Sequence, residues 1–304
     1  MKRILCGLAC MVMALEPARA WNYAGHRAIT FLAYSHLNDK ARKRVDEILR
    51  AHPDYTTVLS NGLSQQPWDI ARNAFVTAST WPDLIRNDPR FSDVPGAPVP
   101  AGFPSASRHQ DWHYTNTGYP AEFASVPVPA VNAISQLPVL LKALKRSGPV
   151  SMQEAYALPW LLHIITDLHQ PLHAVSRYRR VNGKPEHDRG GNGCYLTDNR
   201  NLHSYWDGVL GRDDSESSVA RLAISIGDET PKPARQIVDP TDWVAEAMAL
   251  APTHVYSFPE SCDDKIAPAK LSADYEAKAV RVARQRAALA AYRLAAILND
   301  RLGR

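Results

Sequence analysis

The sequence predicts a mainly α fold in which residues 21–304 form one domain. Apolar residues recur at helical spacing in several segments, and a helix-capping pattern precedes the most apolar of them. No segment alternates apolar and polar residues convincingly, as a strand with one buried face would. A chain of this length can enclose one full hydrophobic core, so its size does not call for a second domain.

Residues 1–20 have the three parts of a secretory signal peptide. Lys2 and Arg3 form a charged start, residues 4–15 are apolar, and Ala-Arg-Ala at residues 18–20 is a cleavage site. The apolar run is too short to span a bilayer, so we expect no stable membrane anchor. We therefore expect cleavage between Ala20 and Trp21 and a protein that is secreted or periplasmic.

The charge and cysteine content set few limits on function. Removal of residues 1–20 lowers the formal net charge from +4 to +2, which by itself predicts no polyanionic partner. Cys194 and Cys262 remain after cleavage. In an oxidising compartment they could form one disulfide, although the sequence leaves their pairing open. The sequence indicates no protein partner, and we expect a monomer.

The first helices are predicted from apolar spacing. Residues 29–37 carry apolar side chains at helical intervals, and residues 41–50 form a second helical pattern that stops before His52-Pro53. Residues 63–86 are predicted to continue as helix. We expect His36 and His52 to be ordinary surface or helix-end residues.

Two longer loops are expected between the helices. Residues 92–108 are rich in Pro, Gly and Ser and have no apolar period, so they read as a surface loop that leads to Trp112-His113-Tyr114. Residues 176–200 are predicted to form a second loop. It contains Gly190-Gly191-Asn192, and glycines permit the backbone to approach a ligand closely.

The later helices have recognisable starts. Ser151 and Glu154 form a capping box for a helix that carries His163, and Pro159 is expected to kink this helix or to start a second segment. Asp242 is predicted to cap a helix that runs to about residue 251.

The last helix is predicted to begin at the cap Ser272. Its expected buried stripe consists of Val280, Ala283, Ala287, Leu294, Ile297 and Leu298. Its arginines are expected to form a solvated face: Arg281, Arg284, Arg286, Arg293 and Arg301.

The segment 163–173 holds the densest set of chemically active side chains. His163 and Asp167 are four residues apart, so a helix projects both from one face, and Pro171 ends the helix and presents His173. Three imidazoles and a carboxylate suit a borderline metal such as zinc. A buried helix with hydrogen-bonded histidines is the alternative. His203-x-x-x-Asp207 repeats the same step, which favours the metal site.

Several motifs occur in a fixed order and together resemble one enzyme family. They are Trp21 at the expected mature N-terminus, Gly25-His26, Trp81-Pro82-Asp83-x-x-Arg86, Trp112-His113-Tyr114, His163-x-x-x-Asp167-x-His169-Gln170-Pro171-Leu172-His173, Gly190-Gly191-Asn192 and His203-x-x-Trp206-Asp207. This series is similar to the zinc-dependent single-strand-specific nucleases, which include the fungal nucleases S-one and P-one and the plant bifunctional nucleases. The resemblance implies a multi-helix fold shared with zinc-dependent phospholipase C.

The resemblance implies three zinc ions, and each family ligand has a counterpart here. One ion would be held by Asp83, His113, His163 and Asp167. A second would be held by His173, His203 and Asp207. The third would be held by Trp21 through its free amine and carbonyl oxygen, by His26, and by the second oxygen of Asp167.

The activity implied is hydrolysis of single-stranded DNA and RNA to 5′-phosphate products, with 3′-nucleotidase activity as a further expectation. Arg86 and Asp167 would be catalytic; a surface ion pair is the alternative for Arg86. Tyr114 would stack a nucleobase, or else be a core tyrosine. Asn116 stands where fungal members carry an aspartate; it can hydrogen-bond a base but cannot act as a general base. Asn192 would contact substrate. His169, absent from the family's ligand set, is expected behind the ligands or in the core.

Two other functions compete with the nuclease. A zinc-dependent phospholipase C acting on phospholipid headgroups has a related fold, but its last helical ligand is glutamate, where this chain has Asp207. A zinc protein without turnover would have closed coordination and would not require Arg86.

Overall fold

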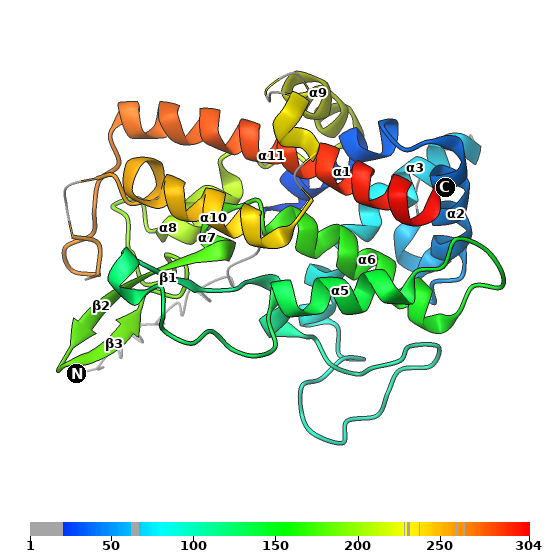
Figure 1. The fold of residues 1–304 in the computed structure, drawn as a ribbon, viewed down its shortest axis with the longest axis horizontal. Coiled ribbons are helices and arrows are strands. Elements are labelled where there is room, and N and C mark those ends of the chain that lie inside the picture. The colour runs from blue at the N-terminus through cyan, green and yellow to red at the C-terminus, as the bar shows by residue number, and fades with distance from the viewer. Residues whose placement is uncertain are drawn as a thin grey trace, which may run out of the picture.

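The computed structural model describes residues 21–304 except 62–66, 228, 230–231, 237, 259–260 and 264; the side chains of 67, 68, 232 and 233 are also left out. The expected signal peptide, residues 1–20, lies outside the described residues. The described chain is mainly helical, which confirms the predicted fold class (Figure 1).

Longer connections separate α4 from α5, α7 from α8 and α10 from α11; the other helices follow one another more closely. In the first half the helices are α1 (Tyr23–Ser35), α2 (Asp39–Arg50), α3 (Pro67–Ala78), α4 (Trp81–Leu84), α5 (Ala133–Ala143) and α6 (Met152–Asp167). In the second half they are α7 (Pro171–Ala174), α8 (Leu202–Gly208), α9 (Glu216–Ile226), α10 (Pro240–Leu250) and α11 (Ala273–Leu302).

Helix α6 lies at the centre of the molecule. It contacts α1, α2, α3, α5 and α11, and every side chain from Glu154 to Asp167 is buried. The long helix α11 crosses the molecule beside α1, and its last turns lie near α2 (Figure 1). Because α6 is enclosed on all sides, its polar residues lie in the interior.

The predicted helix starts are confirmed for α6 and α11. Ser151 and Glu154 form the capping box of α6, and the hydroxyl of Ser272 accepts a hydrogen bond from the backbone N–H of Tyr275 in α11. Helix α6 continues through Pro159 as one element, so the prediction of a second segment there was wrong. The predicted helix over 63–86 is divided, because α3 ends at Ala78 and α4 starts at Trp81; its residues 63–66 lie outside the described residues.

The prediction of a loop over residues 176–200 was wrong in its first part. Strand β2 (Val175–Val181) pairs antiparallel with β3 (Lys184–His187), and β1 (Thr117–Tyr119) pairs parallel with the other edge of β2. Asn182 and Gly183 connect β2 to β3 with positive φ angles of 50° and 77°. Asn-Gly is the standard two-residue signal for a β-hairpin turn. It indicated this hairpin, whereas the pattern of apolar residues did not.

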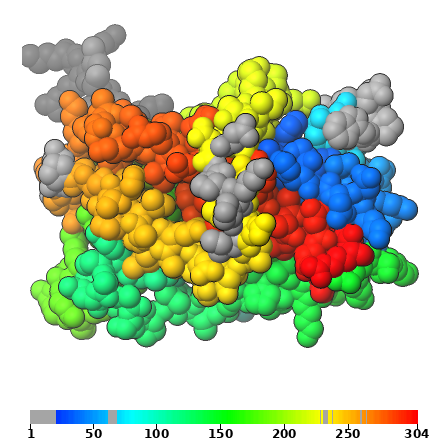
Figure 2. All heavy atoms as spheres, turned by 45° about the horizontal axis from the view of Figure 1, so that its top comes forward, coloured from blue at the N-terminus to red at the C-terminus, as the bar shows by residue number. Residues whose placement is uncertain are grey.

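Three predictions about the last two helices were also wrong. Helix α10 is capped by Asp239, whose carboxylate accepts from the N–H of Thr241, and not by Asp242. Val280 is exposed. Arg286 and Arg293 are buried, because both reach Glu246 of α10; Arg293 Nη1 lies 2.8 Å from Glu246 Oε2. In Figure 2 the segments of α10 (yellow-orange) and the first part of α11 (orange) lie side by side on one face of the molecule.

His52 is not a surface residue. It is buried against Trp81 and Phe103, and its Nδ1 accepts a hydrogen bond from the N–H of Asp54. Burial lowers the pKa of His52 to about 4. His36 is exposed, as expected. Among the described residues, no helix has the length and apolar character of a membrane span.

Candidate metal centre

Asp167, at the end of α6, lies among four imidazoles from different parts of the chain. Its Oδ2 lies 3.1 Å from His163 Nε2 and 3.2 Å from His113 Nδ1. The same oxygen lies 3.6 Å from His173 Nδ1, and Oδ1 lies 3.3 Å from His26 Nε2. All five side chains are buried. The fold therefore brings His26 and His113 from distant parts of the chain to the segment that carries the other three side chains.

Asp83 adds a second carboxylate on one side of this cluster. It lies in α4, with Oδ1 3.9 Å from His163 Nε2, and Arg86 Nε lies 3.3 Å from the same oxygen. His26, Asp83 and His163 form one group whose ligand atoms all lie within 4.8 Å of one another, and His113, His163 and Asp167 form another.

His173 also belongs to a third group, with His203 and Asp207. His173 Nε2 lies 3.8 Å from Asp207 Oδ1, and His203 Nε2 lies 3.5 Å from Asp207 Oδ2. Helix α7 supplies His173, and α8 supplies the other two from a single helix face. Gln170 donates from Nε2 to Asp207 Oδ1 over 2.7 Å and so fixes this carboxylate.

Three of the imidazoles are held at Nδ1 by a backbone carbonyl oxygen. His163 Nδ1 lies 2.7 Å from Ser79 O, His173 Nδ1 lies 2.6 Å from His113 O, and His203 Nδ1 lies 2.6 Å from Gly190 O. A carbonyl only accepts, so each Nδ1 carries a proton, and Nε2 is the nitrogen whose lone pair a metal ion could bind. This is the arrangement by which proteins orient histidine ligands of metals. In this structure His163 Nε2 lies 2.8 Å from His113 Nδ1.

The unsatisfied polar atoms of the cluster fit a bound cation. Within the described residues, several buried atoms of these side chains have no hydrogen-bond partner: Asp83 Oδ1 and Oδ2, His113 Nε2, Asp167 Oδ1, His173 Nε2 and Asp207 Oδ2. Unsatisfied buried polar atoms are costly, and a cation would satisfy them. Nitrogen and oxygen donors of this kind suit zinc.

Burial also determines the charge of the ligand candidates. It lowers the pKa of His26 and of His113 well below the ordinary value, and nearby histidines and Arg86 lower both further. Burial raises the pKa of Asp167, although the histidines around it act in the opposite direction. Burial acts to lower the pKa of His163 and His173 too, but neighbouring carboxylates outweigh it, so the pKa of His163 is raised and that of His173 is raised to about 9. A metal ion would have to displace these protons in order to bind the two imidazoles.

Trp21 lies next to this cluster. Its buried indole donates from Nε1 to Thr166 O over 3.0 Å, and the N–H of Asn22 donates to Asp207 O over 3.0 Å. Asn22 then caps α1, the helix that carries His26. A Cβ on Gly25 would lie 2.9 Å from Trp21 Cβ, so glycine is required for this packing. The chain at residue 21 is thus fixed between α6 and α8.

A cleft of about 670 Å³ opens over the cluster. Three of the candidate ligands, His113, His173 and His203, line it. So do the other residues singled out from the sequence: Arg86, Tyr114, Asn116 and Asn192. Tyr114 is half-buried and its hydroxyl donates to Asp111 Oδ1 over 3.2 Å, so it is part of a wall and not of the core. His169 lies elsewhere, between Ile165 O and Arg293.

The cleft also contains two cationic side chains, Arg189 and Lys265, that the sequence patterns did not indicate. Arg189 and Lys265 line it beside Arg86, and the described lining includes no Asp or Glu. Arg189 precedes the glycine pair that was noted, but Lys265 comes from a distant loop and carries no local signal. The disulfide between Cys194 and Cys262, left open by the sequence, joins these two segments.

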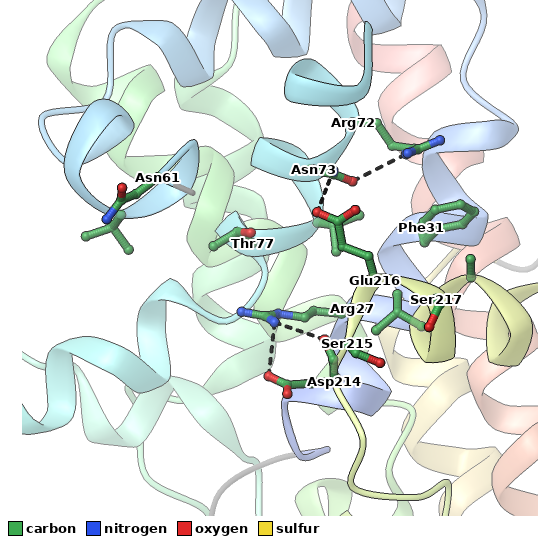
Figure 3. Close-up of a pocket in the computed structure, with 14 residues that line it drawn as sticks. Arg27, Phe31, Asn61, Arg72, Asn73, Thr77, Asp214, Ser215, Glu216 and Ser217 are labelled. Carbon is green, nitrogen blue, oxygen red and sulfur yellow. Dashed lines mark hydrogen bonds and ion pairs between the residues drawn. The ribbon is translucent and has the colours of Figure 1, made fainter. Parts of the chain in front are cut away.

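A second pocket of about 670 Å³ lies between α1, α3 and α9 (Figure 3). Arg27 Nη1 lies 3.0 Å from Asp214 Oδ2, and Asn73 Nδ2 donates to Glu216 over 3.2 Å. The pocket's other cation, Arg72, forms an ion pair with Asp69 over 2.9 Å. None of the candidate metal ligands lines this pocket, whereas three of them border the first cleft.

Comparison with known proteins agrees with this geometry. A protein-family model described as S1/P1 Nuclease matches residues 21–303, which includes every residue of the cluster and of the cleft. No curated protein matches the chain.

Proposed function

Because the chain belongs to the S1/P1 nuclease family, we propose that it is a zinc-dependent endonuclease that hydrolyses single-stranded DNA and RNA to 5′-phosphate products. The observation that carries this proposal is the meeting of three His/Asp groups beneath a cleft whose described lining contains cations and no carboxylates. A phosphodiester is an anion, and such a cleft attracts it to the groups that could act on it.

The proposed centre holds three zinc ions. Asp83, His113, His163 and Asp167 would hold the first, and His173, His203 and Asp207 the second. Trp21, His26 and Asp167 would hold the third. Zinc supplies Lewis acidity that polarises a phosphoryl group and lowers the pKa of water. The orphaned polar atoms and the Nε2 lone pairs described above support this set.

Arg86 has the position of a residue that acts on the phosphate. It lines the cleft, its side chain is only 16% exposed, and it is held beside Asp83. A guanidinium presents several N–H donors in a fixed plane, which suits the oxygens of a phosphoryl group that gains charge during hydrolysis. Arg86 would orient the phosphate and stabilise that charge.

The rest of the cleft would hold the nucleotide. Tyr114 offers an aromatic face for a base, and a base is free to stack on it only when it is unpaired. Asn116 and Asn192 offer hydrogen bonds to the base or the sugar, while Arg189 and Lys265 would neutralise neighbouring phosphates. These contacts support a preference for single strands.

The remaining parts of the proposal concern the whole protein. Residues 21–304 would form one nuclease domain, secreted or periplasmic after cleavage between Ala20 and Trp21, and monomeric. A 3′-nucleotidase activity is included, because a 3′-phosphate on one stacked nucleoside presents the same groups as a strand.

Hydrolysis assays with defined substrates test the proposal. Single-stranded DNA, RNA and 3′-AMP are expected to be hydrolysed, each with loss of activity in a chelator and recovery with zinc. Duplex DNA and phosphatidylcholine serve as comparison substrates. Hydrolysis of phosphatidylcholine in preference to single-stranded DNA would replace the nuclease by a phospholipase, and full activity after complete removal of zinc would exclude a zinc enzyme.

A further inference from the structure

Asn116 has an unusual backbone and a fixed side chain at the edge of the cleft. It has a φ of 57°, in the left-handed region that Asn and Asp tolerate better than most residues. It comes directly before β1, whose parallel pairing with β2 places Gly118 opposite Ser176. Ser176 is buried, and its Oγ lies 2.7 Å from Asn116 Oδ1.

A row of hydrogen bonds connects Asn116 to the metal centre. His203 Nδ1 lies 2.6 Å from Gly190 O, and the N–H of Gly190 donates to Ser176 Oγ over 2.7 Å. Ser176 Oγ then contacts Asn116 Oδ1. Gly190 has a φ of 61°, and a Cβ there would lie 2.3 Å from Leu172 O, so this peptide is fixed in place.

The donors and acceptors of this row allow only one orientation of the Asn116 amide. The N–H of Gly190 can only donate, so the hydroxyl of Ser176 accepts there and must donate its own proton elsewhere. The carbonyl oxygen of Asn116 accepts that proton. If the amide were reversed, the buried hydroxyl would keep an unsatisfied proton, at a cost larger than a normal hydrogen bond is worth. The Asn116 NH₂ group therefore faces the cleft that the residue lines.

We infer that Asn116 reads the nucleobase as a hydrogen-bond donor and selects cytosine over guanine at the base site next to Tyr114. This inference rests on the proposed nuclease function. Cytosine presents two neighbouring acceptors, N3 and O2, on its pairing edge. Guanine presents two neighbouring donors, N1–H and N2–H₂, which would point at the hydrogens of the Asn116 amide. Ser176 acts as a positioning residue, because it touches the amide and not the base.

Two variants separate the reading group from the group that orients it. Asn116→Asp keeps the shape and the left-handed backbone, and its second oxygen faces the cleft as an acceptor. The preference is expected to reverse toward guanine. Ser176→Ala frees the amide to rotate, so the preference is expected to disappear without reversing. Asn182→Asp is the matched control, because Asn182 is an exposed left-handed asparagine in the turn between β2 and β3.

The readout is the base composition at the ends produced from a random single-stranded DNA pool. At one position beside the cut, the zinc-loaded wild-type protein and Asn182→Asp are expected to favour C over G by roughly tenfold, the size of one well-placed hydrogen-bond pair. Equal use of C and G by the wild type, or an unchanged C preference in Asn116→Asp, would overturn the inference.

Binding of CMP and GMP to the zinc-loaded proteins, measured by calorimetry, gives a readout that does not need turnover. The wild type is expected to bind CMP more tightly than GMP, and Asn116→Asp is expected to bind GMP more tightly than CMP. Ser176→Ala is expected to bind both with similar affinity. If the protein cuts single strands without base preference, the proposed function stands and the inference about Asn116 is wrong. If the protein binds CMP more tightly than GMP but cuts no nucleic acid, the inference about Asn116 stands and the proposed function is wrong.

Discussion

Gln170 donates a hydrogen bond from Nε2 to Oδ1 of Asp207 over 2.7 Å, and both side chains are buried. The carbonyl oxygen of the same amide accepts from the N–H of Leu172 over 2.6 Å, so the amide cannot reverse. Gln170 thus caps α7 and fixes the carboxylate of α8 with one group. It does so without being a ligand candidate itself.

Gln170→Glu is therefore expected to weaken metal binding by the group His173, His203 and Asp207. The new carboxylate cannot donate to Asp207 and brings a like charge against it, and loss of such supporting contacts costs roughly 10–100-fold in metal affinity. Zinc titration against a competing chelator measures this. Gln153→Glu, an exposed change in the first turn of α6, is the control. Wild-type affinity in Gln170→Glu would show that this hydrogen bond does not support the site.

Asp167→Ala is expected to be the most damaging change at a single ligand candidate. Its carboxylate lies within 3.6 Å of four imidazoles, so it is placed to serve more than one ion. Metal analysis of the purified variant should show loss of more than one zinc per chain. Asp274→Ala removes an exposed carboxylate in α11 and should lose none. Three zinc ions in Asp167→Ala would contradict the bridging role.

Tyr114→Ala is expected to raise KM more than it lowers kcat on single-stranded DNA. Stacking of a base on an aromatic ring is worth about 1–3 kcal/mol, and the ring does no chemistry. Tyr114→Phe keeps the ring and loses only the hydrogen bond to Asp111, so its KM should remain near that of the wild type. Unchanged kinetics in Tyr114→Ala would make this residue a packing residue only.

His52 is expected to make the fold sensitive to acid. Burial lowers its pKa from 6.5 to about 4, so below pH 6.5 the unfolded chain binds a proton that the folded protein refuses. The stability from this residue is present above pH 6.5 and is lost as the pH falls to about 4, by up to about 3 kcal/mol.

Urea unfolding at several pH values, with His52→Gln beside the wild type, measures this slope. The variant keeps a hydrogen-bond acceptor and cannot titrate, so its stability should fall less between pH 6.5 and 4. His254→Gln, at a partly exposed position after α10, is the control and should follow the wild type. Release of metal in acid is shared by all three proteins and cancels in the comparison. Parallel curves for His52→Gln and wild type would contradict the expected role.

A single residue added before Trp21 is expected to prevent complete metal loading. A peptide nitrogen has its lone pair committed to the amide, whereas a free terminal amine with a pKa near 8 can bind zinc. Protein that starts at Trp21 should bind three zinc ions and be fully active, and the extended form should lack one ion and activity. Equal zinc content and activity in both forms would refute a role for the Trp21 amine.

The elements that were predicted correctly had complete local signals. Ser151 and Glu154 show the start of α6 within four residues, and the spacing of His163 and Asp167 follows from the helix alone. The hairpin β2–β3 was missed because β2 carries arginines where apolar residues were expected, although Asn182-Gly183 indicated the turn.

Other features depend on partners that are distant in the sequence. The sequence around Arg286 and Arg293 predicts solvated side chains, because it does not show that α10 places Glu246 beside them. In the same way, the sequence around His52 does not show that Phe103 packs against it. No pattern in the sequence indicated that Ser176 contacts Asn116, because this contact depends on the pairing of β1 with β2. Local patterns therefore predicted several of the helices and indicated the candidate ligands, but not α5 or α9. The burial of charged side chains and the orientation of amides could be seen only in the fold.

The burial of α6 from Glu154 to Asp167 has a consequence for protein engineering. Since no side chain from Glu154 to Asp167 reaches solvent, a substitution along this stretch changes the packing around His163 and Asp167. Attempts to alter substrate range are better directed at the cleft wall, where Asn116, Arg189 and Lys265 lie on loops. Helix α6 carries the candidate ligands His163 and Asp167, and the surrounding loops are where substitutions can be made without repacking it.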